Sequence, residues 1–168
     1  MKLTSGMADH LTTRRAFVLR AAAAVAATSL AGTRAFAAPP ATRITVYKDP
    51  NCGCCVNWNA AMRKAGFVVD VRDTQNISAV KASLGVPDAL ASCHTGVVAG
   101  YLFEGHVPPD LVQKVLRERP AIVGLFVPGM PSGSPGMEGP NPSEYDVIAL
   151  GRDRRQAVYA TRMGRAQA

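Results

Sequence analysis

Apolar and polar residues between positions 43 and 119 follow two different periods. Short β-branched or alternating runs predict strands, whereas longer runs of helical composition predict helices. The predicted strands span residues 43–48, 67–72, 95–99 and 101–104. The predicted helices span residues 56–65, 77–84 and 108–119. The predicted order is therefore βαβαββα.

The pattern changes beyond Pro120. An apolar run, a loop rich in glycine and proline, and two strand-like runs follow at residues 121–127, 128–142, 145–150 and 156–161. A loop of this length without secondary structure is either functional or mobile. Because the βαβαββα order resembles the thioredoxin fold, we expect an α/β, thioredoxin-like single domain with an additional C-terminal β-hairpin. The tail after about residue 151 receives no function.

Residues 1–38 are typical of an export signal rather than of a folded element. Residues 13–19 read TRRAFVL, which resembles the twin-arginine export signal. The alanine-rich stretch at 21–31 is shorter than the ~20 apolar residues that span a bilayer, so no membrane anchor is expected after signal removal. An ordinary secretory signal with a chance arginine pair is the alternative. Both predict that the mature domain, residues 39–168, lies outside the cytoplasm, which for a bacterial protein we take to be the periplasm.

The charge of the chain lies largely in this signal. Five of the 19 basic residues and one of the 12 acidic residues lie within residues 1–38, so the net charge falls from +7 to +3 without them. The remaining cations are scattered apart from Arg152, Arg154 and Arg155. Because no basic face with interleaved aromatic residues emerges, nucleic-acid binding is not expected.

Three of the four cysteines lie in the stretch KDPNCGCCVNW, residues 48–58. Cys52 and Cys55 have C-x-x-C spacing at a predicted helix start, where thiolates are stabilised, and this favours a redox pair. Cys54 would compete in thiol exchange, so three neighbouring thiols suit a soft metal better. Two structural disulfides, with three possible connectivities, are the alternative in an exported protein.

A second group of candidate ligands precedes and follows the predicted strands at 95–99 and 101–104. Cys93 and His94 lie where thioredoxin-like proteins carry a proline facing the C-x-x-C pair, and this chain has no proline there. A two-residue turn at Ala99 and Gly100 would place His106 opposite Cys93. The three side chains would then converge on the cysteine turn. Alternatively, His94 caps the strand and His106 is an ordinary turn residue.

Methionine and carboxylate side chains are the remaining candidate ligands. Met130 and Met137 lie in the glycine-rich loop and could bind Cu(I), or could pin the loop to the core. We expect Met62 to lie in the core. Asp49 and Asn51 are expected to shape the turn and cap the helix. Three glutamates, Glu104, Glu138 and Glu144, are expected in solvent. The sequence contains no convincing pair of catalytic carboxylates and no Ser/His/Asp set.

Four stretches in order resemble the CopG-like periplasmic copper-resistance proteins. They are YKDPNCGCCVNW, SCHT, EGHVP and GMPSGSPGME, and the resemblance runs from about residue 44 to 150. It implies a thioredoxin-like fold and a copper site in which thiolates bridge more than one ion. The ligands implied by position are Cys52, Cys54, Cys55, Cys93, His94 and His106, with Met130 and Met137 as further candidates.

We therefore expect an exported copper-binding protein that sequesters Cu(I) and interconverts Cu(I) and Cu(II) in copper resistance. A binding protein is favoured over an enzyme. The alternative from another class is a periplasmic thiol–disulfide oxidoreductase using Cys52 and Cys55. A third hypothesis is a chaperone that passes copper to a periplasmic efflux or oxidase protein. The number of ions and their oxidation states stay open at this point.

Overall fold

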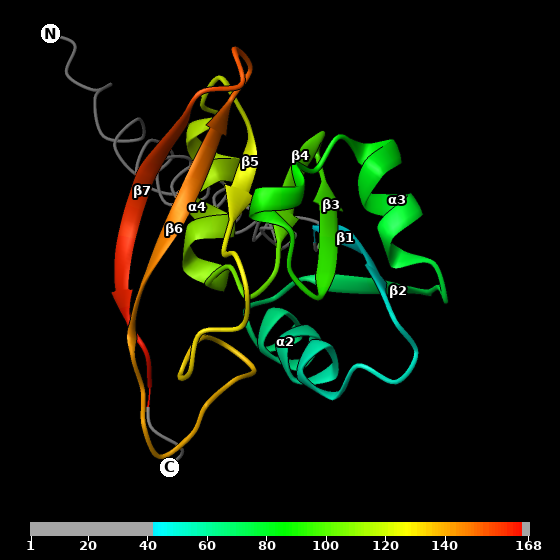
Figure 1. The fold of residues 1–168 in the computed structure, drawn as a ribbon, viewed down its shortest axis with the longest axis vertical. Coiled ribbons are helices and arrows are strands. Elements are labelled where there is room, and N and C mark those ends of the chain that lie inside the picture. The colour runs from blue at the N-terminus through cyan, green and yellow to red at the C-terminus, as the bar shows by residue number, and fades with distance from the viewer. Residues whose placement is uncertain (1–41, 166–168) are drawn as a thin grey trace, which may run out of the picture. The chain divides into compact units, whose positions relative to one another are not determined.

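A seven-stranded sheet and three α-helices make up the part of the chain that the computed structural model describes, residues 42–165 (Figure 1). The strands are β1 (Arg43–Lys48), β2 (Val68–Asp73), β3 (His94–Val98), β4 (Tyr101–Glu104), β5 (Ile122–Phe126), β6 (Glu144–Gly151) and β7 (Gln156–Met163). The helices are α2 (Gly53–Lys64), α3 (Ile77–Leu84), α4 (Pro109–Glu118) and the short 3₁₀ helix η1 (Asp88–Leu90). No helix in the described part is both long and apolar enough to cross a membrane. The predicted export signal lies outside the described residues.

The strand order across the sheet is β2-β1-β3-β4-β5-β6-β7. Strands β1 and β2 are parallel, as are β4 and β5, and the other neighbours are antiparallel. Strands β3 and β4 turn at Ala99 and Gly100, which both have positive φ, as a two-residue hairpin turn of the primed type requires. Val98 pairs with Tyr101, so the predicted turn is confirmed.

The apolar run at 121–127, to which the sequence pattern assigned no element, contains β5. Gly124 lies beside β4 so closely that a Cβ there would overlap the backbone of Leu102. A glycine inside an apolar strand often marks such a close approach of two backbones. Strand β5 therefore joins the first four strands to the antiparallel pair β6 and β7.

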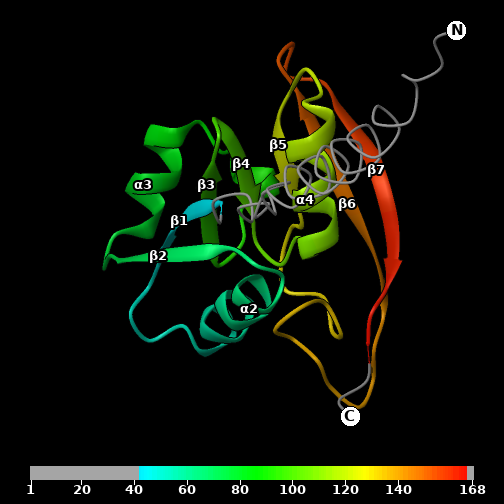
Figure 2. The same cartoon turned by 180° about the vertical axis from the view of Figure 1, so that it is seen from behind.

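Two hydrophobic clusters lie on opposite faces of the sheet. The larger cluster includes Trp58 from α2, Phe103 from β4 and Val112 from α4. The smaller cluster contains Leu102 and is flanked by Leu84 at the end of α3. Since neighbouring side chains of a strand point to opposite faces, α2 and α4 cover one face and α3 lies on the other (Figures 1 and 2).

The loop between β5 and β6 folds back beside α2, as both views in Figures 1 and 2 show. Its turns are held by backbone hydrogen bonds from Gly133 to Met137 and from Met137 to Ser134. A Cβ at Gly136 would lie 2.6 Å from the backbone nitrogen of Trp58, and Gly136 has φ +88°. Glycine is therefore required for the loop to approach the first turn of α2.

Candidate metal centre

The turn before α2 presents the first three cysteines. The backbone N–H of Asn51 donates to the Asp49 carboxylate at 2.8 Å, and the N–H of Cys52 donates to the Asp49 carbonyl at 3.1 Å. Asp49 thus shapes the turn, as expected. The expectation that a polar residue caps the helix is wrong, because Cys52 is the N-cap and its side chain makes no capping hydrogen bond.

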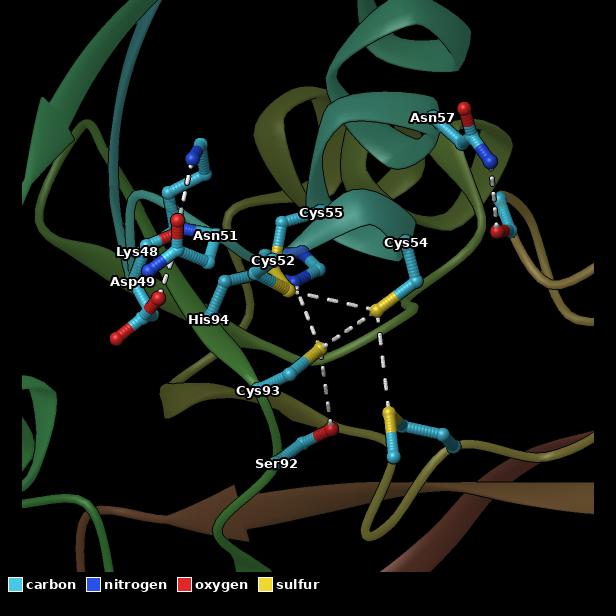
Figure 3. The surroundings of a disulfide bond; sticks show 12 residues. Lys48, Asp49, Asn51, Cys52, Cys54, Cys55, Asn57, Ser92, Cys93 and His94 are labelled. Carbon is cyan, nitrogen blue, oxygen red and sulfur yellow. Dashed lines mark hydrogen bonds between the residues drawn. A yellow bond between two sulfur atoms is a disulfide. The ribbon is translucent and has the colours of Figure 1, made fainter.

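Cys52 and Cys55 are joined by a disulfide, with an S–S distance of 2.03 Å (Figure 3). Cys54 and Cys93 are free thiols. The bonded pair is the one that C-x-x-C spacing favours. A disulfide sulfur is not a thiolate, so Cys52 and Cys55 could serve as metal ligands only after reduction.

The four cysteine sulfurs form a compact cluster, here called the sulfur group: Cys52, Cys54, Cys55 and Cys93. Their Sγ atoms all lie within 4.8 Å of one another. The Sγ of Cys54 is 3.4 Å from that of Cys52 and 3.8 Å from that of Cys93. Figure 3 shows Cys54 and Cys93 pointing toward each other beside the disulfide. The α2 turn and the start of β3 therefore supply one soft ligand set.

A second cluster shares one of these sulfurs and is here called the imidazole group: Cys93, His94 and His106. The Sγ of Cys93 lies 3.2 Å from His94 Nδ1 and 3.1 Å from His106 Nε2. The pairing of β3 with β4 continues past the strand ends, because the Gly105 N–H donates to the His94 carbonyl at 2.9 Å. The predicted position of His106 beside Cys93 is confirmed.

Both imidazole rings are fully buried. His106 Nδ1 lies 2.8 Å from the Pro135 carbonyl, which can only accept, so Nδ1 carries the proton and Nε2 presents its lone pair to Cys93. The His94 ring packs between Trp58 and His106, with centroid distances of 4.4 and 5.2 Å. His94 Nε2 is buried and has no hydrogen-bond partner within residues 42–165. Ring packing therefore orients His94, and the hydrogen bond to the Pro135 carbonyl orients His106.

The environment keeps the imidazole group uncharged. Burial, followed by the charges of His106, Lys81 and Lys48, holds the pKa of His94 well below its ordinary value. Burial also lowers the pKa of His106, although its hydrogen bond to Pro135 opposes that shift. Burial and then Cys54 raise the pKa of the Cys93 thiol to about 12. Neutral imidazoles are ready to bind a metal, whereas Cys93 would become a thiolate through the charge of the metal itself.

Comparison with known proteins identifies the family of this chain. Residues 90–137 match a family model described as "Protein of unknown function, DUF411". Two solved forms of a copper resistance protein CopG are each 47% identical to this chain with a TM-score of 0.69. They cover 72% and 73% of this chain, and 98% of the CopG chain is covered in each case. The chain belongs to the CopG-like copper resistance family. No match was found among curated proteins.

Family membership and the cysteine cluster together support a copper-related role for this CopG relative. The two loop methionines differ in placement. Met130 is 54% exposed, and its Sδ lies 3.8 Å from Cys54 Sγ. Met137 is half-buried, and the contacts that the structure gives it are backbone hydrogen bonds inside the loop. Among the sulfur contacts found within residues 42–165, Met130 is the methionine that meets the sulfur group. Met62 is fully buried, as expected.

The burial of Glu104 differs from the expectation. This residue was expected in solvent, but its side chain is fully buried. The carboxylate accepts from Lys81 Nζ, from the Ser92 N–H at 2.6 Å and from the Thr95 hydroxyl at 2.5 Å. The alternation in β4 could have indicated this, since Glu104 shares the face of buried Leu102. Glu138 and Glu144 are exposed, in agreement with expectation.

Proposed function

We propose that this chain sequesters Cu(I) in a site where thiolates bridge more than one copper ion. The observation that carries the proposal is the position of Cys93 Sγ, which belongs to both the sulfur group and the imidazole group. A single thiolate between two donor sets is suited to bridging two ions. Thiolate and thioether ligands select Cu(I), and copper enters through the relatives that are named as copper resistance proteins.

The proposed ligands divide by softness. Cys52, Cys54 and Cys55 supply thiolates once the disulfide is reduced, and Met130 adds a thioether at the exposed side. His94 and His106 supply imidazoles, which accept both Cu(I) and Cu(II) and so make interconversion of the two states part of the proposal. Met137 stays in the proposed set only as an outer candidate, because its described contacts lie within its own loop.

The proposal extends to fold and location. The parallel pair β1 and β2, the antiparallel β3 and β4, and the helices on both faces support a thioredoxin-like assignment for the first four strands. Strands β6 and β7, which are antiparallel neighbours, would be the additional hairpin. We assign residues 1–38 to a twin-arginine export signal and the mature domain to the periplasm. A copper efflux or oxidase protein would be its exchange partner there.

Metal analysis of the mature protein tests the proposal. The full chain is expressed in a bacterium, recovered from the periplasm, reduced without oxygen and offered Cu(I) or Zn²⁺ separately. We expect more than one copper per chain, strong preference for copper over zinc, and a mature N-terminus near residue 39 by mass spectrometry. Equal and weak uptake of both metals would overturn copper sequestration.

A second function is favoured by the disulfide itself. Cys52 and Cys55 form a C-x-x-C disulfide at the start of α2, as a thiol–disulfide oxidoreductase would require. One variant separates the two functions. Cys54→Ser should lower copper binding if copper sequestration is correct, whereas a redox enzyme should keep or improve its insulin reductase activity. Strong reductase activity in Cys54→Ser, together with no copper in the parent protein, would favour the enzyme.

A further inference from the structure

Behind the imidazole group lies a buried network of charged and polar groups that meets the cysteine sulfurs at Ser92, whose hydroxyl lies 3.9 Å from Cys93 Sγ. Its centre is Glu104, which is fully buried at the end of β4. One carboxylate oxygen accepts from Lys81 Nζ and from the Ser92 N–H, and the other accepts from the Thr95 hydroxyl. Lys81 Nζ also donates to that hydroxyl at 3.0 Å. The network thus joins α3, β3 and β4.

The network and the imidazole group lie on opposite faces of the sheet. His94 packs on Trp58 of α2, whereas Thr95, the next residue of β3, bonds to Glu104. On β4, Phe103 lies in the cluster with α2, and Glu104 points to the α3 side. Glu104 therefore acts through the backbone of β3 and β4 rather than by touching a metal.

The residues that Glu104 holds flank the candidate ligands on both sides. Ser92 and Thr95 immediately bracket Cys93 and His94 in the chain. Glu104 is itself separated from His106 only by Gly105. A Cβ at Gly105 would lie 2.6 Å from the Ser92 side chain, so these two segments are packed as closely as backbone geometry permits.

We propose that Glu104, neutralised by Lys81, is a positioning residue that aligns Cys93 with His106 before a metal arrives. The proposal rests on the proposed copper site and adds the device that preorganises its buried half. The carboxylate fixes the Ser92 backbone against β4, and Cys93 Sγ consequently meets His106 Nε2 at 3.1 Å. Preorganised ligands bind more tightly because less ordering is left for the moment of binding.

The alternative role, stability alone, fits the chemistry less well. Removing two charges from water offsets much of what a buried ion pair gains, and apolar pairs of similar volume are often equally stable. An apolar pair at Lys81 and Glu104 would fill the same space, but it could not accept the Ser92 N–H. The distinctive contribution of Glu104 is therefore the position of residues 92–95.

Two double variants distinguish positioning from stability. In Lys81→Met/Glu104→Leu the ion pair is replaced by apolar side chains. In Lys81→Met/Glu104→Gln the buried charge is removed, but an amide oxygen remains to accept from the Ser92 N–H, and the amide nitrogen can donate to the Thr95 hydroxyl. We expect the first to bind Cu(I) roughly 10–100-fold more weakly, the range found for partners that orient metal ligands. The second should stay close to the parent.

The readout is competition with a Cu(I) chelator on anaerobically reduced protein, together with X-ray absorption at the copper edge. The Leu variant should lose copper–nitrogen scattering while copper–sulfur scattering persists. Glu144→Gln, at an exposed glutamate of β6, is the matched control and should change neither quantity. Folding of each variant is checked by circular dichroism.

Parent-like affinity and parent-like nitrogen scattering in the folded Leu variant would overturn the proposal. Should that variant not fold, Glu104→Asp decides, because it keeps the negative charge but is one methylene too short to hold the Ser92 N–H. Weakened copper binding in Glu104→Asp supports positioning, and unchanged binding refutes it. Failure of the parent to bind copper would instead refute the proposed function.

Discussion

The two halves of the candidate centre differ in exposure and in what holds them. In the sulfur group Cys55 is fully buried but the other three cysteines are half-buried, and the neighbouring Met130 is 54% exposed. In the imidazole group, His94 and His106 are fully buried. Cys93 is the one residue that both share.

This difference shows which part of the centre depends on chemical state. The imidazole group is set by the register of β3 and β4, by the packing of His94 on the Trp58 ring and by the hydrogen bond from His106 to the Pro135 carbonyl. The sulfur group has two of its four sulfurs in a disulfide. Its capacity for metal therefore depends on reduction, whereas that of the imidazole group does not.

Removing the shared sulfur should have the largest effect. Cys93→Ser takes a ligand from both groups, so we expect Cu(I) affinity to fall by at least about 100-fold, beyond the 10–100-fold typical of residues that only orient ligands. Cys54→Ser takes a ligand from the sulfur group alone and is the control. The measurement is chelator competition with the reduced proteins. Equal losses in the two variants would show that Cys93 is not shared.

Oxidation should lower copper binding by the sulfur group but not by the imidazole group. Protein with the Cys52–Cys55 disulfide intact should bind fewer copper ions per chain than reduced protein, since two thiolates are missing. The double variant Cys52→Ser/Cys55→Ser cannot form this bond and should show the same low stoichiometry with or without reductant. Elemental analysis after desalting measures the ratio. Identical copper content in oxidised and reduced parent protein would remove the disulfide from the metal site.

The pH should act on the imidazole group of the metal-free protein. The folded-state pKa of His94 is lowered, so the unfolded chain takes up protons first as the pH falls below about 6.5. Stability is fully present above that pH and declines below it, until the folded-state pKa is reached. His94→Gln should flatten this decline by up to about 1.4 kcal/mol per pH unit. Urea unfolding between pH 6.5 and 5 provides the measurement, and parallel curves for variant and parent would contradict it.

The smallest effect is expected at the exposed border of the sulfur group. Met130→Leu removes the thioether that lies 3.8 Å from Cys54 but keeps a similar apolar volume. We expect Cu(I) affinity to fall a few-fold, about 1 kcal/mol, because thioethers are weak ligands compared with thiolates. Met137→Leu is the control, since the described contacts of Met137 are backbone hydrogen bonds. A loss at Met137 equal to that at Met130 would mean that the loop closes differently over copper.

Much of the buried half could be predicted, because a hairpin with a two-residue turn makes pairing a matter of counting. Once Ala99 and Gly100 form the turn, Cys93 must face His106. The alternation in β4 could indicate the face of Glu104, but its ion-pair partner could not be obtained by counting, since Lys81 lies on a helix 23 residues earlier. Local alternation gives the face of the sheet to which a side chain points, but not the residues that contact it there.

The sulfur group could be predicted only in part. Sequence spacing identifies Cys52 and Cys55 as a possible pair, but whether they are bonded or bind metal depends on the redox conditions around the chain. The loop methionines have equivalent surroundings in the sequence, and only the fold of the loop around Gly136 distinguishes Met130 from Met137. The path of a glycine-rich loop is set by contacts with α2, which its own composition does not encode.

Trp58, described above as a core residue of α2, also gives the molecule an optical property. It is the only tryptophan of the chain, and its ring centroid lies 4.4 Å from that of His94. Its indole N–H donates to the Val107 carbonyl at 2.9 Å, so the ring is held rigidly in that place. Indole emission is quenched by a protonated imidazole or a copper ion at such short range. The intrinsic fluorescence of this protein is therefore a single-site signal of what occupies the imidazole group, obtained without any added label.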